Sequence, residues 1–197
     1  MVELRGDDVY LRHLGVDDAA GLLALRLRNR EFFARFEPRH PRPVTTLDEQ
    51  MAAILRDLDD ARGDRTYYFG IFLNATGELI GRIGLFNIVR EAFQNAVCGY
   101  FLDESKNNLG YMSQAVQLLV RYAFDELGLH RVEAGVMPRN TGSIRVLEKA
   151  GFRREGLMEN YLQINGNWED HYGFAITAED YAAFKTARAA GATTSKP

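Results

Sequence analysis

Alternation and helical spacing in the first third of the chain predict one strand followed by two helices. In "DDVYLRHL" (7–14) residues of opposite character alternate along the backbone, which is the period of a half-buried strand. Leucines recur at loosely helical spacing across 16–29, so we expect a first helix there. A second helix is expected over 45–63, because Thr46 and Glu49 form a capping box ahead of a helical run.

Aromatic and β-branched runs in the middle of the chain predict three consecutive strands. These runs are 66–73, 78–89 and 96–102. The segment "NATG" (74–77) has the composition of a tight turn and joins the first two runs into a hairpin. We therefore expect three neighbouring antiparallel strands in the sheet.

The second half of the chain opens with an amphipathic helical segment. Across 111–128 the apolar residues form one stripe at helical spacing, and Gly128 ends it. The stripe consists of Met112, Ala115, Val116, Leu119, Val120, Ala123 and Leu127. The later expected elements are a strand (130–137), a short helix (141–151), two strands (160–165 and 168–177) and a last helix from Ala178. The order β-α-α-β-β-β-α-β-α-β-β predicts an α+β fold with a mixed sheet.

Length, charge and cysteine content narrow the classes of protein that fit these elements. The 197 residues favour one domain, expected over 1–185, followed by a flexible C-terminal tail over 186–197. A net charge of −3 argues against a broad basic surface for nucleic acid, and the single cysteine excludes a disulfide framework and a cysteine-rich zinc site. No segment approaches the roughly 18 apolar residues of a membrane span. We expect a cytoplasmic protein without a metal, with Cys98 as a small buried strand residue.

The stretch "SKNNLGYMSQAV" (105–116) is the first candidate site. A polar loop leads through Gly110 directly into the helix, and the N–H groups of 108–113 point beyond the helix start. Such a turn is suited to an anion such as phosphate. From spacing alone, an ordinary helix start is the favoured alternative.

The stretch "MPRNTGSIRVLEKAGF" (137–152) is the second candidate site. Asn140 or Thr141 caps the short helix, and Ser143 lies in its first turn. These polar residues either serve the helix start alone or face a cleft beside the first candidate site. Spacing alone favours the first alternative.

The motifs flanking these two sites resemble a known family. "GYFLDESKNNLGYMSQAV" and "LHRVEAGVMPRNTGSIRVLEKAGFRREG" are similar to GCN5-related N-acetyltransferases (GNAT), and to the RimJ/RimL branch of ribosomal-protein N-terminal acetyltransferases. "NYLQINGNWEDH" extends the similarity to RimJ in particular, and the resemblance covers most of 8–177. It implies the GNAT fold, in which helices flank a mixed, mostly antiparallel sheet that splays between its fourth and fifth strands.

The resemblance implies acetyl-CoA as cosubstrate and gives its place. Pantetheine would lie in the gap between the strand ending at Tyr100–Leu102 and the strand 130–137, and the pyrophosphate would rest on N–H groups of 107–112. Asn140 would contact the pantetheine arm, and Ser143 would approach the thiol. The implied cofactor-binding residues are Tyr100, Phe101, Leu102, Asn107, Asn108, Leu109, Gly110, Tyr111, Met112, Ser113, Asn140 and Ser143.

The pyrophosphate loop departs from the pattern of the family it resembles. The family pattern is Arg or Gln-x-x-Gly-x-Gly or Ala, and the matching run here starts at Asn107 and ends at Met112. Only Gly110 is strictly kept, while Asn108 and Leu109 stand where related loops often have flexible or basic residues. Because the cradle uses main-chain donors, we expect CoA to bind, but more weakly than in glycine-rich relatives.

The catalytic groups of related enzymes carry over only in part. The tyrosine acid of many GNAT enzymes falls at Leu147 here, and Ser143 is the matching candidate of the RimL-like branch. The glutamates that relatives use as bases fall at Gly135 and Leu162. Glu37, Glu133 and a water relay remain as alternatives, and we favour a water-assisted route with electrostatic help from Glu37. The candidate catalytic residues are Ser143, Glu37 and Asn140.

The acceptor is the least defined part of the prediction. The resemblance favours the N-terminal α-amine of a protein, implied to be ribosomal, attacked directly in a ternary complex. A small amine such as an antibiotic or aminoacyl nucleotide, and a weakly active CoA-binding module, are the alternatives. Glu37, Trp168 and Asp170 are the candidate substrate-binding residues, although Trp168, Asp170 and His171 equally fit a role in fixing the last hairpin. The protein is expected to be a monomer or homodimer.

Overall fold

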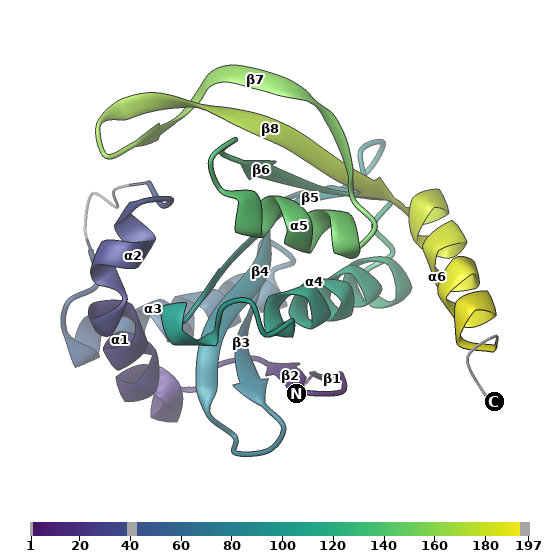
Figure 1. Ribbon diagram of the computed structural model, residues 1–197. Helices are drawn as coiled ribbons and strands as arrows, with labels where there is room; N and C mark the ends of the chain where they lie inside the picture. The colour runs from purple at the N-terminus through teal and green to yellow at the C-terminus, as the bar shows by residue number, and fades with distance from the viewer. Residues whose placement is uncertain (1, 39–42, 194–197) are drawn as a thin grey trace.

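The strands of the described chain form one eight-stranded sheet, ordered β1-β2-β3-β4-β5-β6-β8-β7 (Figure 1). The computed structural model describes residues 2–38 and 43–193, with the backbone alone for 188–193. The strands are β1 (Glu3–Arg5), β2 (Val9–Arg12), β3 (Tyr67–Leu73), β4 (Leu79–Val89), β5 (Asn95–Leu102), β6 (Arg131–Val136), β7 (Arg153–Ile164) and β8 (Asn167–Thr177). The helices are α1 (Ala19–Arg28), α2 (Arg30–Ala34), α3 (Leu47–Arg62), α4 (Tyr111–Arg121), α5 (Thr141–Lys149) and α6 (Ala178–Thr193).

The parallel pair β5–β6 creates the main feature of the sheet. These strands pair only from Asn95 opposite Arg131 to Val97 opposite Glu133, and then diverge. The other described strand pairs are antiparallel, which confirms the expected mixed, mostly antiparallel sheet. Beyond Val97 and Glu133, the two backbones no longer bond to each other, and we call the region between their diverging ends the gap.

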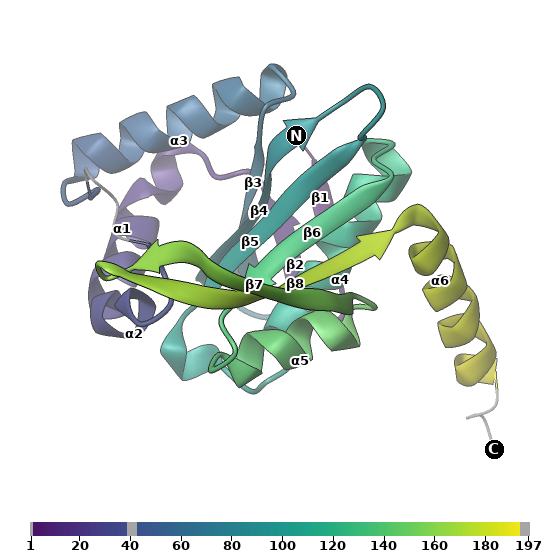
Figure 2. The same ribbon diagram turned by 90° about the horizontal axis from the view of Figure 1, so that it is seen from above.

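Helices cover the two faces of the sheet differently. The buried apolar residues of α4 and α5, including Leu119 and Leu147, pack with the sheet residues Phe69, Leu85 and Phe174 into the larger core. On the other face, α1 and α3 enclose a smaller cluster around Leu14, Leu22, Ile54 and Phe72 (Figure 2). Each fully buried leucine or phenylalanine contributes about 1.5–3 kcal/mol, so the expected stripe of the 111–128 segment stabilises the larger core.

The sequence pattern did not predict two short elements, β1 and α2. β1 has three residues, too few for alternation to show, and it pairs antiparallel with β2. Because β1 precedes the expected first strand, the expected fourth and fifth strands are β5 and β6, and the splay lies between them as expected. α2 has five residues and follows α1 after a break at Asn29, where the sequence predicted no helix.

Two predicted boundaries were also wrong. β7 begins at Arg153 rather than at 160, because nearly all its side chains are exposed and give no apolar period at this sheet edge. The helix expected over 111–128 stays α-helical to Arg121 and continues as a π-helical turn over Tyr122–Glu126. Its apolar spacing alone does not distinguish the two kinds of turn.

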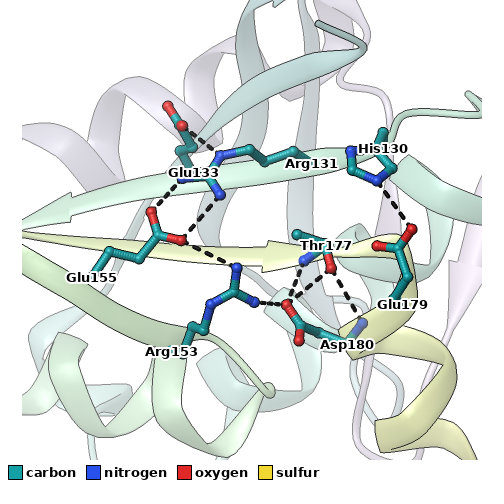
Figure 3. A network of polar contacts seen from close by, with 8 residues as sticks. All are labelled: His130, Arg131, Glu133, Arg153, Glu155, Thr177, Glu179 and Asp180. Atoms are coloured by element: carbon teal, nitrogen blue, oxygen red, sulfur yellow. Dashed lines mark hydrogen bonds and ion pairs between the residues drawn. The ribbon is translucent and has the colours of Figure 1, made fainter.

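A polar network fixes the start of α6 against β6 and β7 (Figure 3). Arg131 bonds Glu133 at 2.7 Å and also pairs with Glu155, while Arg153 bonds Asp180. Asp180 in turn accepts hydrogen bonds from the N–H and hydroxyl of Thr177, both at 3.0 Å. The helix then runs to Thr193, through part of the expected flexible tail, and residues 194–197 of that tail lie outside the described residues.

The β7–β8 hairpin extends across the splay toward α2 (Figure 2). At its tip, the side-chain amide of Asn165 donates a hydrogen bond to the carbonyl oxygen of Ala34. This bond joins segments 131 positions apart in the sequence. The tip of the hairpin and the end of α2 are therefore held together.

Candidate active site

The loop between β5 and α4 presents consecutive main-chain N–H groups at the surface. Within the described part of the chain, the N–H groups of 108–113 have no hydrogen-bond acceptor. Gly110 is the N-cap of α4 with a φ of +86°, and a Cβ added there would meet nothing within 4 Å. Asn108 has a φ of +63°, a conformation that asparagine adopts more readily than most residues. Free N–H groups at the positive end of a helix dipole suit a phosphate or pyrophosphate.

The end of α1 holds the start of this loop. Asp103 is 5% exposed, and its carboxylate accepts hydrogen bonds from Arg28 Nε at 2.7 Å and from Ser105 Oγ at 2.9 Å. Burial disfavours the carboxylate, but the hydrogen bonds outweigh it, so the pKa of Asp103 lies below its ordinary value. Buried Asn29 accepts a further hydrogen bond from the Glu104 N–H at 2.9 Å. The sequence did not reveal the ion pair of Arg28 with Asp103, because the two residues lie 75 positions apart and neither belongs to a motif.

The first turn of α5 borders the gap beside β5. The hydroxyl oxygens of Tyr100 and Ser143 are 2.8 Å apart. The side-chain oxygen of Asn140 accepts a hydrogen bond from the Ser143 N–H at 3.2 Å and so caps the helix, as one of the two expected cap residues. The cap holds the Ser143 hydroxyl where it meets the tyrosine from the neighbouring strand.

Burial sets the protonation of the two titratable groups on β5. It raises the pKa of Tyr100, and the hydrogen bond with Ser143 offsets only part of this rise. The phenol therefore stays protonated at neutral pH and is able to donate a hydrogen bond. Burial also raises the pKa of Cys98 to about 12. The expected structural role of this 5% exposed cysteine is confirmed, because a neutral buried thiol is a poor nucleophile.

α1 and α2 bring a carboxylate to the other side of the β5 end. Arg26 donates to Glu37 at 2.9 Å, and its guanidinium lies 4.8 Å from the ring centroid of Phe101. The ring of Phe33 packs against Phe101 at 4.9 Å. The Glu37 side chain keeps 30% of its surface exposed. A partly exposed carboxylate beside the gap suits an approaching cationic group.

The β7–β8 hairpin supplies the remaining predicted residues. Trp168 is 61% exposed and lines a shallow cavity of about 290 Å³ with Pro138 and Arg139. Asp170 also borders this cavity, but its carboxylate accepts a hydrogen bond from the Asn160 N–H at 2.8 Å. Asn160 lies in the bulge of β7 with a φ of +47°. Asp170 therefore stabilises the hairpin through its bond to the bulge. The Trp168 ring remains available to a ligand.

Comparison with known proteins decides the family. Residues 8–153, more than half of the chain, match the family model described as the acetyltransferase (GNAT) domain. This chain is a GNAT acetyltransferase. It is 48% identical over 177 residues to the probable N-acetyltransferase YjcK of Bacillus subtilis, an alignment that covers 90% of this chain and 98% of the relative.

Other relatives of this GNAT acetyltransferase carry more specific names. The ribosomal protein uS5-alanine N-acetyltransferase of Escherichia coli is 29% identical over 180 residues, which cover 91% of this chain and 93% of that enzyme. The solved structure of Mycobacterium smegmatis RimJ in complex with CoA-disulfide has a TM-score of 0.86 and 31% identity, and the match covers 96% of this chain and 93% of that one. These findings confirm the expected family, its RimJ-like branch and the GNAT fold.

The GNAT acetyltransferase is an enzyme that uses acetyl-CoA as cosubstrate. The free N–H groups around Gly110 fit a pyrophosphate, and the edge of β5 beyond Val97, which does not pair with β6, is able to bond an extended arm. Among the described residues, no three His, Cys, Asp or Glu side chains are grouped to hold a metal ion. None of the described helices has the length and apolar character needed to cross a membrane.

The structure brings the expected cofactor residues of the GNAT acetyltransferase to one edge of the splay, where α4 and α5 begin (Figure 1). They lie on the end of β5 (Tyr100, Phe101 and Leu102), in the loop and first turn of α4 (107–113) and at the start of α5 (Asn140 and Ser143). Met112 is 7% exposed and packs in the core, so only its main chain is left for a ligand. The individual roles of these residues, and the weaker CoA binding expected of this loop, stay predictions.

Proposed function

We propose that this enzyme acetylates the N-terminal α-amine of a cytoplasmic protein, with ribosomal proteins as the substrate class. The observation that carries the proposal is the similarity, over 91% of the chain, to ribosomal protein uS5-alanine N-acetyltransferase. The partly exposed Glu37 carboxylate beside the end of β5 supports it, because an N-terminal ammonium group carries the opposite charge. The bond between Asn165 and Ala34 supports it too, since it joins the β7–β8 hairpin to the end of α2 and so restrains the approach of a bulky acceptor.

The reaction is a direct acetyl transfer from acetyl-CoA in a ternary complex. The acceptor amine attacks the thioester carbonyl, and the CoA thiolate leaves. Main-chain N–H groups near Phe101 and Leu102 polarise the carbonyl, as preorganised donors do in acyl transfer. An α-amine with a pKa of about 7.7–8.0 has a substantial neutral fraction at neutral pH, whereas a lysine, near 10.4, has almost none. N-terminal acceptors therefore need only modest help from a base.

The leaving thiolate receives its proton from the Tyr100–Ser143 pair. Their hydroxyl oxygens, 2.8 Å apart, form a short relay at the start of α5. Burial raises the pKa of Tyr100 and disfavours a phenolate, so the pair acts as a relay that gains a proton from the attacking nitrogen as it passes one to the thiolate. The tyrosine on β5 thereby supplies the acid that the leucine at 147 does not. Asn140 contributes by fixing the turn that carries Ser143.

A panel of acceptors tests the proposal. The enzyme is incubated with acetyl-CoA and with peptides that differ in their first residue, beside small amines, and the release of free thiol is followed. Mass spectrometry then locates the acetyl group. Acetylation of peptide α-amines is the expected result, and transfer to small amines alone would refute it.

One observation favours a second candidate, a small-molecule amine acceptor. The exposed indole of Trp168 borders a cavity of about 290 Å³, which has room for a planar group of modest size. Efficient turnover of an aromatic amine, lost in Trp168→Ala and absent with every peptide, would establish this alternative. CoA binding without turnover of any acceptor would leave a binding module.

A further inference from the structure

His171 on β8 is a buried imidazole that the mechanism above leaves unused. It lies opposite Met158 of β7 and is 4% exposed. The ring of Tyr161, itself 50% exposed, covers the imidazole with a centroid distance of 5.5 Å. The β7 bulge makes this contact possible, because three residues of β7 stand there against Asp170 alone and carry Tyr161 over β8.

Gly135 leaves the imidazole open toward β6. A Cβ added at Gly135 would meet Cδ2 of His171 at 3.7 Å and the Tyr161 ring at 3.4 Å. Gly135 follows Glu133, the last residue of β6 that pairs with β5, by two positions and on the same face of the sheet. Gly135 is itself exposed, so the imidazole lies next to a solvent-facing glycine just beyond the point where the pairing of β5 and β6 ends.

The main chain fixes which nitrogen of His171 is basic. Nδ1 lies 3.0 Å from the carbonyl oxygen of Glu169. Since a carbonyl oxygen only accepts, Nδ1 carries the proton, and Nε2 of the neutral ring keeps a free lone pair. In the chain described here, Nε2 makes no hydrogen bond of its own. The arrangement is that of an oriented base whose basic nitrogen is unoccupied.

We propose that Nε2 of His171 is the general base that removes a proton from the acceptor ammonium group as it reaches the gap beside Gly135. This inference rests on the proposed function and adds the base that it lacks. An N–H bond of the ammonium group breaks, and its electron pair remains on nitrogen to attack the thioester carbonyl. The nitrogen of the tetrahedral intermediate then loses a second proton, which replaces the one that the Tyr100–Ser143 pair passes to the leaving thiolate, and the imidazolium on His171 releases its proton to water.

The carboxylates near His171 are paired with arginines, so they do not take the place of His171 as the base. On β8, Glu169 is bonded to Arg139 through both carboxylate oxygens. On β6, Glu133 shares the face of Gly135 and is bonded to Arg131. From β7, the titratable group that packs on the imidazole is Tyr161. Both carboxylates on this face are thus neutralised by arginines and do not compete for the acceptor proton.

The test compares His171→Asn with the wild-type enzyme across pH. The Asn amide is able to replace the Nδ1–H donor to the Glu169 carbonyl, but it offers nothing in place of Nε2. His13→Asn is the matched control, because His13 Nδ1 lies 2.9 Å from the Tyr68 carbonyl and its ring stacks on Phe69, outside the site. CoA titration and thermal melting establish that each variant is folded, and His171→Gln is measured in parallel as a second replacement.

The expected result follows from the acceptor amine. At pH 7 about one α-amine in ten is neutral, so a variant that depends on this fraction loses roughly 10-fold in kcat/KM. At pH 9 the amine is mostly neutral in solution, and the variant should come within about 2-fold of wild type. His13→Asn should follow the wild-type profile. CoA affinity should not change.

The outcomes separate two failures. If the wild-type enzyme transfers acetyl to no α-amine, the proposed function fails. If it does, but both His171 variants stay within 2-fold of it at pH 7, only the role of His171 is overturned. A loss of equal size at pH 7 and pH 9 also overturns it, because a structural defect is not relieved by deprotonating the acceptor.

Discussion

The proposed cofactor and acceptor sides of the splay present different kinds of chemical group. On the proposed cofactor side, the main-chain N–H groups of 108–113 have no acceptor among the described residues, and a buried carboxylate, Asp103, holds the loop behind them. On the acceptor side, the available groups are side chains from distant segments, among them Glu37 and the 61% exposed Trp168. One side offers backbone on a rigid support, and the other offers side chains at the surface.

This difference suits the two ligands. A pyrophosphate requires donors in a fixed arc, and the backbone at a helix start provides them with little regard to sequence. The acceptor differs from one enzyme to the next, and exposed side chains are the parts of a surface that change without loss of the fold. Substitutions on the cofactor side should therefore act on CoA binding or on the acetyl transfer step, and those on the acceptor side on KM for the peptide.

The largest effect is expected for the hydroxyl relay between the two sides. Tyr100→Phe removes the protonated phenol that lies 2.8 Å from Ser143 and should lower kcat by about 100-fold, the lower end of general-acid effects. CoA binding should stay the same, since the ring is kept. Tyr67→Phe is the control, because its hydroxyl also has a raised pKa, about 12, but is bonded to Asp64 away from the gap. Steady-state kinetics with less than a 2-fold loss for Tyr100→Phe would remove the relay.

The second effect tests the backbone cradle itself. Ala in place of Gly110, at a φ of +86°, should cost about 1–2 kcal/mol of strain and move the N–H groups, which lowers CoA affinity by roughly 10-fold. Gly128→Ala carries similar strain at a φ of +62°, with equally open surroundings but outside the loop. It should lower the melting temperature and leave CoA affinity unchanged. Calorimetric titration of both variants distinguishes a cradle from an ordinary helix start.

The helix starts on the proposed cofactor side were largely predictable from the sequence. The loop residues and the two helix starts carry their signal locally, in Gly110 and in the Asn140–Ser143 turn, and family resemblance reversed the preference for plain helix starts. The amphipathic stripe of α4 gave its buried face correctly, because burial follows spacing along one element. The sequence did not predict the support behind the loop, because the pairing of Arg28 with Asp103 joins residues that share no motif.

The acceptor side was harder to predict for a physical reason. β7 is exposed along nearly all its length, so no apolar period marks its first half or its bulge. The contact of Tyr161 with His171 depends on that bulge. The bond between Asn165 and Ala34 forms only because the hairpin reaches α2. Such contacts arise from the assembled sheet, and short-range patterns do not contain them.

The third effect tests the support of the cradle through pH. Asp103→Asn leaves Arg28 without its charge partner and should cost about 1–3 kcal/mol at pH 7. The pKa of Asp103 is lowered by folding, so its contribution is present above the unfolded value, near 3.9, and is lost as pH falls through the folded one. Urea unfolding should therefore show the wild type losing its advantage over the variant below about pH 4. A difference that stays constant down to pH 3 would contradict this.

The smallest effect is expected for the carboxylate on the acceptor side. Glu37→Gln removes one charge from a side chain that is already bonded to Arg26 and 30% exposed, so its field at the gap is partly neutralised and screened. We expect KM for a peptide acceptor to rise about 3-fold, with kcat and CoA affinity unchanged. Because the charge acts on the ammonium form, the rise should shrink above pH 8, where the acceptor loses its charge. Glu31→Gln, on the exposed first turn of α2, is the matched control. If kcat/KM for Glu37→Gln equals that of wild type at every pH, the acceptor is recognised by shape and by the hairpin instead. The contrast between the two sides would then be one between an apolar surface and a backbone cradle.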